Sequence, residues 1–239
     1  MSNGVKTLPG DDLKQARGSL SSGQPPQKKT NASGETTQVD AAVRTLVVPA
    51  VAVGNVGQIA VDLLCKLGDL PVEVIDSEGL LMPCVGNAGK QSKRRISTSL
   101  ELHTFSTQVS LLHISSMVVP GRSRLFSRLV LQLAKTRGFQ RILVVGAASA
   151  LALINDDQLS RTRHVPRLYN LPLDDGFLQL EYEVSELKLA GLLPFFIQES
   201  AETGVNVGAI VSFVFEGENW SDGVEMCKAT MKVLAIQPE

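Results

Sequence analysis

Short apolar runs alternate along the chain with longer amphipathic stripes, and this alternation predicts the strands and helices of an α/β protein. Runs bounded by turn-forming residues predict buried strands, since they have the length of a strand and no polar face. The predicted strands are 44–49, 71–76, 141–146 and 205–215, with a further pair within 100–116.

Helical periodicity predicts four helices. The clearest is 122–137, in which leucines, a valine and Phe126 form one apolar stripe before Gly138 ends the helix. Asp222 is expected to cap the last helix, because Glu225 follows three residues later as in a capping box. The predicted helices are 57–67, 122–137, 222–236 and one within 187–203 that Pro194 begins or interrupts.

The order of these elements predicts an α/β fold with a mostly parallel central sheet, some antiparallel strands and helices on both faces. Residues 41–239 are expected to form a single α/β domain, in which 77–95 and 151–180 are rich in loops. Residues 1–40 are polar and contain no aromatic side chain, so they predict a disordered N-terminal tail.

Composition excludes several classes of function. The net charge is −1, with one Trp and two Tyr, so a general nucleic-acid binder is not expected. The cysteines, Cys65, Cys84 and Cys227, lack the spacing of a disulfide framework or a zinc knuckle, which favours a reducing compartment. No secretory signal and no apolar run of membrane-spanning length is apparent. A cytoplasmic and nuclear location is therefore expected, with no membrane partner.

The most distinctive motif is the glycine-bearing turn between the first predicted strand and helix. It reads Pro-Ala-Val-Ala-Val-Gly-Asn-Val-Gly-Gln over 49–58. Glycine allows positive φ and close backbone approach, and free N–H groups at the helix start could receive a carboxylate or phosphate. The motif matches neither a dinucleotide fingerprint nor a P-loop. A tight structural turn and a protein-contact surface are both favoured over a nucleotide site.

The remaining polar residues do not assemble a reactive group. His103 and His113 lie on predicted strands, where half-buried, hydrogen-bonded side chains are expected, and His164 lies in a loop. No metal-binding histidine spacing and no nucleophile elbow is present, so no catalytic residue, metal or cofactor is predicted. The basic segments 93–95 and 161–167 are interpreted as solvated charge, or as a contact for an acidic partner.

Three segments, 49–58, 81–87 and 213–219, resemble the proteasome assembly chaperone family, with likeness extending over about 45–236. The resemblance implies a three-layer α/β/α sandwich, no enzymatic activity and no cofactor. It also implies a heterodimer with proteasome assembly chaperone 1 that promotes formation of the 20S proteasome α ring from its α subunits and prevents off-pathway ring association. The predicted partner contacts are Val51, Val53, Gly54, Asn55, Val56, Gly57 and Gln58.

Two alternatives remain open, because a fold does not fix a function. They are a small-molecule enzyme of nucleoside-phosphorylase type and a nucleotide-binding module. A deep pocket with convergent polar groups would favour either one, whereas a flat apolar face near Val51, Val53 and Val56 would favour the chaperone.

Overall fold

The computed structural model describes residues 43–88, 95–153, 165–183, 186–187 and 189–237. These residues belong to one compact unit, Thr36–Glu239. The predicted tail, 1–40, lies outside the described residues, as do His164 and most of the two basic segments. Within the described part of the chain, no helix combines the length and apolar character needed to cross a membrane.

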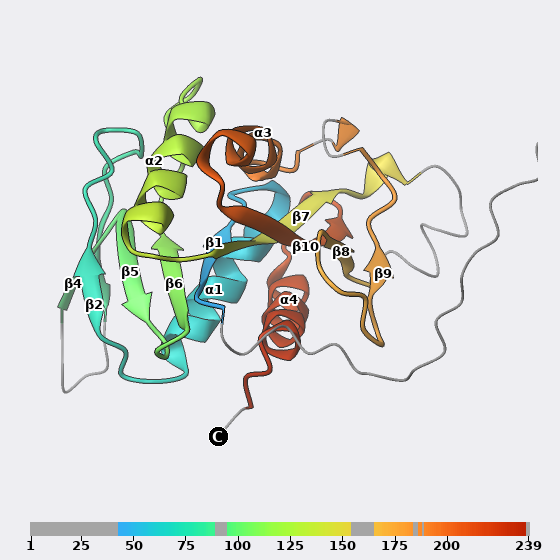
Figure 1. Cartoon of the computed structure of the whole chain (residues 1–239), viewed down its shortest axis with the longest axis horizontal. Coiled ribbons are helices and arrows are strands. Elements are labelled where there is room, and N and C mark those ends of the chain that lie inside the picture. Colours follow the sequence, from blue (N-terminus) through green and yellow to red (C-terminus); the bar gives the residue numbers. More distant parts are fainter. Residues whose placement is uncertain (1–42, 89–94, 154–164, 184–185, 188, 238–239) are drawn as a thin grey trace, which may run out of the picture. The chain divides into compact units, whose positions relative to one another are not determined.

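An eight-stranded sheet in the order β2-β5-β6-β1-β7-β10-β8-β9 forms the centre of this unit (Figure 1). Four adjacent strands are mutually parallel, and antiparallel neighbours flank them on both sides. A separate hairpin pairs β3 with β4. The strands are β1 (Thr45–Pro49), β2 (Val72–Val74), β3 (Val85–Ala88), β4 (Arg95–Thr98), β5 (Leu100–Thr104), β6 (Val109–Ile114), β7 (Arg141–Ser149), β8 (Arg167–Tyr169), β9 (Leu178–Gln179) and β10 (Asn206–Val214).

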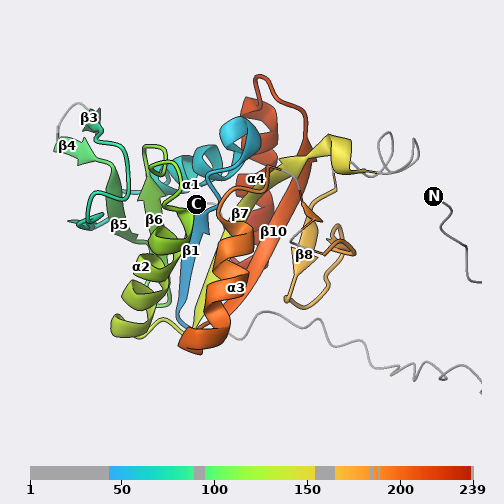
Figure 2. The same ribbon diagram turned by 90° about the horizontal axis from the view of Figure 1, so that it is seen from above.

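Helices cover both faces of the sheet (Figure 2). Helices α1 (Val56–Lys66) and α4 (Trp220–Val233) pack together on one face, and α2 (Ser123–Thr136) and α3 (Leu193–Thr203) pack on the other. Short 3-10 turns, Val53–Asn55 and Ala150–Ala152, follow β1 and β7. The α/β/α sandwich with a mostly parallel sheet is thereby confirmed.

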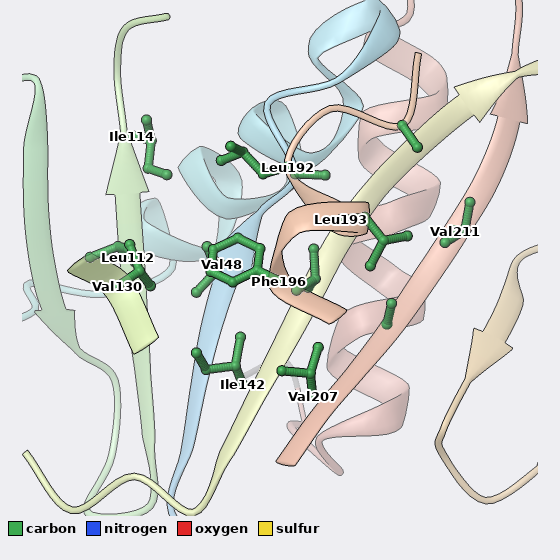
Figure 3. Packing of buried hydrophobic residues seen from close by; sticks show 14 of the residues in the cluster. Val48, Leu112, Ile114, Val130, Ile142, Leu192, Leu193, Phe196, Val207 and Val211 are labelled. Carbon is green, nitrogen blue, oxygen red and sulfur yellow. The ribbon is translucent and has the colours of Figure 1, made fainter. Parts of the chain in front are cut away.

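Two apolar cores result from the alternation of side chains along the strands. Val48 and Ile142 face α2 and α3, whereas Val47 and Leu143 face α1 and α4. Phe196 of α3 is fully buried and lies close to Val48 and the sheet (Figure 3).

The predicted helices and long strands are present, but some details of the sequence interpretation are wrong. The last helix begins at Trp220 with Asn219 as its N-cap residue, so Asp222 lies inside the first turn and does not cap it. The region 77–95 contains β3 and the start of β4, and 151–180 contains β8 and β9. These strands are two to four residues long, so they have too few positions to show a periodic pattern.

Candidate functional site

The turn that follows β1 has an unusual backbone. Val51, Gly54 and Asn55 all have positive φ, of 48°, 67° and 52°. Glycine and asparagine tolerate this region, but a β-branched residue such as valine does so only when its surroundings enforce it. The conformation of Val51 therefore indicates a turn held in place by its neighbours.

Glycines, which carry no side chain, allow neighbouring segments to pack directly against the backbone at this turn. A Cβ on Gly57 would lie 2.1 Å from the carbonyl oxygen of Val145, and one on Gly191 would lie 2.3 Å from that of Ala50. A Cβ on Gly54 would lie 2.4 Å from Nδ2 of Asn219. Such distances leave no room for a side chain. These three glycines are thus required for packing at the carboxyl ends of the parallel strands.

Asn219 is the residue that fixes the turn after β10 beside the turn after β1. Its buried side chain donates two hydrogen bonds of 3.0 Å, to the carbonyl oxygens of Phe215 and Gly217. Since the same amide also lies against Gly54, one side chain shapes the 215–219 turn and limits movement of the 51–55 turn.

Backbone hydrogen bonds join a third segment to this turn. The N–H of Leu192 donates to the carbonyl oxygen of Ala50 at 2.6 Å, and the N–H of Val53 donates to that of Leu189 at 3.2 Å. The turn is therefore enclosed by the chain itself on the side of 189–192.

The crevice between β1 and β6 is the usual place for a ligand, because α1 and α2 leave these neighbouring strands toward opposite faces. Here Gln58 bridges it: its Nε2 donates to the carbonyl oxygen of Ile114 at 3.0 Å. Two pockets of about 520 and 470 Å³ open elsewhere on the described chain, and no residue of 51–58 lines either. The site geometry thus gives no support to a nucleotide cradle at this turn.

The predicted contact residues divide into two groups. Val56 and Gly57 are buried and hold α1 against the sheet. Val51, Val53, Gly54 and Gln58 are half-buried, and Asn55 is exposed. Contact of this second group with a partner stays a prediction.

Exposed apolar side chains lie on the segments that follow β7 and β10 and on the 189–192 segment that contacts the turn, a feature that the sequence pattern did not reveal. Leu151 lies two residues after the end of β7, and Phe215 directly follows β10. Trp220 adjoins Asn219, and the carbonyl oxygen of Leu189 accepts the hydrogen bond from Val53. Their exposed fractions lie between 43% and 78%. We call these four residues, with Val51 and Val53, the carboxyl-edge surface. Large apolar side chains gathered at one edge are typical of a protein-contact surface.

A second cluster of polar side chains lies at the other side of the sheet, on β5 and β6. Glu101 is fully buried and is opposite His113 in the antiparallel register, and His103 lies two residues along the same strand. Arg95 donates two hydrogen bonds to the carboxylate, of 2.8 and 3.0 Å, and the Thr98 N–H donates a third of 3.0 Å.

The environment of this cluster shifts several pKa values. Burial alone would raise the pKa of Glu101, but hydrogen bonds from Arg95 and Thr98 outweigh it and hold the pKa below its ordinary value. Burial lowers the pKa of His103 despite its contact with Glu101. The hydrogen bond from His113, assisted by Lys66, lowers the pKa of Asp62 against the effect of burial.

The pocket of about 470 Å³ adjoins this cluster, and its lining includes Asp62, Cys65, Arg95, His103 and His113. Burial raises the pKa of Cys65 to about 12, so the thiol is neutral at physiological pH and unsuited to nucleophilic attack. The hydrogen bonds from Arg95 and Thr98 hold the Glu101 carboxylate in place in its charged form. Histidine spacing along the sequence gave no sign of the cluster, because the β5–β6 register brings the residues together.

Comparison with known proteins decides the family. The sequence model of the PAC2 family matches residues 46–211, which is more than half of the chain. The chain belongs to the PAC2 family. The predicted resemblance to proteasome assembly chaperones is thereby confirmed.

PAC2 family relatives include two vertebrate proteins named proteasome assembly chaperone 2. The mouse protein is 26% identical over 222 residues, which cover 80% of this chain and 81% of the relative. The zebrafish (Danio rerio) protein is 32% identical over 119 residues, so that match spans less than half of each, at 48% of this chain and 45% of the relative.

Solved structures of the PAC2 family type share the fold. Pyrococcus furiosus PbaA, described as an archaeal homolog of proteasome-assembly chaperone, aligns with a TM-score of 0.60 at 12% identity. The alignment covers 82% of this chain and 84% of PbaA. At this level of identity the likeness concerns architecture alone.

Proposed function

We propose that this PAC2 family chain is a chaperone of 20S proteasome assembly that works by covering protein surface, without catalysing a reaction. The names of its vertebrate relatives support the role. The observation that carries the mechanism is the carboxyl-edge surface, since its exposed leucines, Phe215 and Trp220 lie on segments beside a turn whose backbone is fixed by Gly54, Gly57 and Asn219. A rigid apolar surface binds a partner with little ordering cost.

The proposed partners are proteasome assembly chaperone 1, as the other half of a heterodimer, and the proteasome α subunits. Binding to a partner's association surface lowers the concentration of free surface and shifts the assembly equilibrium by mass action. An obligate heterodimer is expected to bury about 2,000 Å² or more with an apolar centre. We place the heterodimer contact at the carboxyl-edge surface, and the complex in the cytoplasm and nucleus.

Co-expression with proteasome assembly chaperone 1 tests the proposal. The wild-type chain should elute with its partner as a single species in size-exclusion chromatography. Leu189→Asp should release the partner, because it places a carboxylate on the carboxyl-edge surface. Aspartate also tolerates the positive φ of 58° at this position, so the variant should fold.

Leu67→Asp is the matched control. Leu67 and Leu189 are both 53% exposed, but Leu67 follows the last residue of α1, at the opposite end of the sheet. The control should keep the partner. Equal retention of the partner by both variants would place the heterodimer contact elsewhere. Loss of α-ring intermediates in cells carrying Leu189→Asp, but not Leu67→Asp, would link the surface to assembly.

A further inference from the structure

The buried cluster on β5 and β6 has the donor atoms of a metal site. The closest ligand atoms of Glu101, His103 and His113 all lie within 4.8 Å of one another. Two imidazoles and a carboxylate are a frequent set of protein ligands for Zn²⁺. All three side chains come from paired strands, whose backbone positions are held by the sheet.

The distances within the cluster suit a metal ion. Nε2 of His103 lies 3.2 Å from Oε2 of Glu101, and Nδ1 of His113 lies 3.8 Å from the same oxygen. Ligand atoms about 2.0–2.2 Å from a tetrahedral ion are roughly 3.2–3.6 Å apart. The ligand atoms of His103 and His113 lie within 4.8 Å of each other, so binding would also bring these two imidazoles up to about 1 Å closer together.

Neighbouring groups orient the ligands as they do around known metal sites. Asp62 lies with Oδ1 3.5 Å from Nε2 of His113, which favours a proton on Nε2 and leaves Nδ1 as the acceptor. The hydroxyl of Ser115 lies 3.2 Å from this Nδ1, and a bound ion would take its place. Arg95 and the Thr98 N–H fix the carboxylate.

An open coordination position would face the pocket of about 470 Å³, which His103 and His113 both line. The pocket gives an ion a route from solvent and leaves room for a water molecule as fourth ligand. Arg95 and Lys66 already balance the charges of Glu101 and Asp62 through ion pairs. Affinity should therefore come mainly from the donor atoms.

We propose that Glu101, His103 and His113 form a binding site for one divalent transition-metal ion, of which Zn²⁺ fits the donor set best, with Asp62 as the positioning residue for His113. The site is independent of the carboxyl-edge surface. A bound ion would join β5 to β6 and, through Asp62, to α1.

Calorimetric titration of the full chain with ZnCl₂, after removal of any affinity tag and treatment with a chelator, tests the proposal. One ion per chain should bind. Glu101→Gln and His113→Gln should each lower the affinity at least tenfold, and Asp62→Asn should lower it about 10–100-fold. His164→Gln, which changes the third histidine of the chain, should bind as the wild type does.

A second measurement on the wild type keeps the test decisive if a variant fails to fold. In NMR spectra of the imidazole nitrogens, ZnCl₂ should shift the signals of His103 and His113 together and leave those of His164 in place. Absence of saturable binding, unchanged affinity in both folded ligand variants, or a shift confined to His164 would each overturn the proposal.

Discussion

Gly57 packs against Val145 so closely that a Cβ at this position would lie 2.1 Å from the valine carbonyl oxygen. The contact joins the first turn of α1 to the middle of β7, and neither backbone can yield without moving the helix or the central sheet.

The Gly57→Ala substitution should therefore destabilise the folded protein substantially. Overpacking a rigid contact costs about 1–3 kcal/mol, and a clash with backbone is at the upper end of that range. Urea denaturation followed by circular dichroism measures the loss. Gly68→Ala is the control, because its Cβ would meet only Leu70 Cδ2 at 3.4 Å. Similar unfolding midpoints for the two variants would contradict the packing role.

Asn219→Ala should lose the two hydrogen bonds that shape the 215–219 turn and leave two carbonyl groups without their donor. The expected cost is about 1–3 kcal/mol. Asn219→Asp keeps the shape of the side chain but cannot donate, so it should lose at least as much stability. If the aspartate variant were as stable as the wild type, the amide would not be the group that fixes the turn. Thermal denaturation of the three proteins gives the comparison.

Glu199 should be important for the packing of α3 on α2. Its carboxylate is 5% exposed and receives a hydrogen bond from Arg128, with Arg124 Nε at 3.0 Å. Glu199→Gln removes the buried negative charge and replaces one acceptor oxygen with an NH2 group, so both guanidinium groups lose their shared carboxylate and a loss of stability is expected. Arg124→Ala should cost less, since Arg124 is largely exposed and Arg128 still neutralises the glutamate. Equal losses in urea denaturation would mean that the carboxylate is not the centre of the group.

Cys65 should react slowly with iodoacetamide in the folded protein. Burial raises its pKa from an ordinary 9.0 to about 12, so near pH 8 the folded thiol ionises far less than the unfolded one. Alkylation at pH 8 should be at least about tenfold slower in buffer than in urea, because the thiolate is the nucleophile. The native rate should keep rising with pH above 9, where the rate for the unfolded chain levels off. Peptide mass spectrometry follows the residue, and equal rates in both solvents would contradict the pKa shift.

The raised pKa also fixes the sign of a stability effect. The folded state favours the protonated thiol, so ionisation of Cys65 does not lower the free energy of unfolding below pH 9. It lowers that free energy as pH rises from 9 toward 12. Cys65→Ser should remove this part of the alkaline decline.

Much of the fold follows from local patterns in the sequence. The stripe around Phe126 predicts α2, and the valines of 44–49 predict a central strand, because helix and strand periodicities are visible within a dozen residues. The glycine-bearing turn is visible for the same reason. The sequence does not reveal the contact between that turn and Asn219. Asn219 lies 165 positions after Gly54, and the contact depends on how β10 aligns with β7.

The cluster of Glu101, His103 and His113 could not be predicted from the sequence for a related reason. Glu101 and His103 alternate with leucines as any half-polar strand does, and His113 becomes their neighbour only through the β5–β6 register. A one-residue change of register would turn His113 to the opposite face. For Asp222 the local pattern itself was misleading. The sequence has the spacing of a capping box there, but the helix already begins at Trp220.

The sheet order has a consequence for synthesis on the ribosome. Strand β1 is made early, yet it lies between β6 and β7, and its loop is held by Gly191 and Asn219. A nascent polypeptide that has emerged only through β7 still lacks Leu189, Phe215 and Trp220. The carboxyl-edge surface therefore cannot form until β10 and the first turn of α4 have also been made.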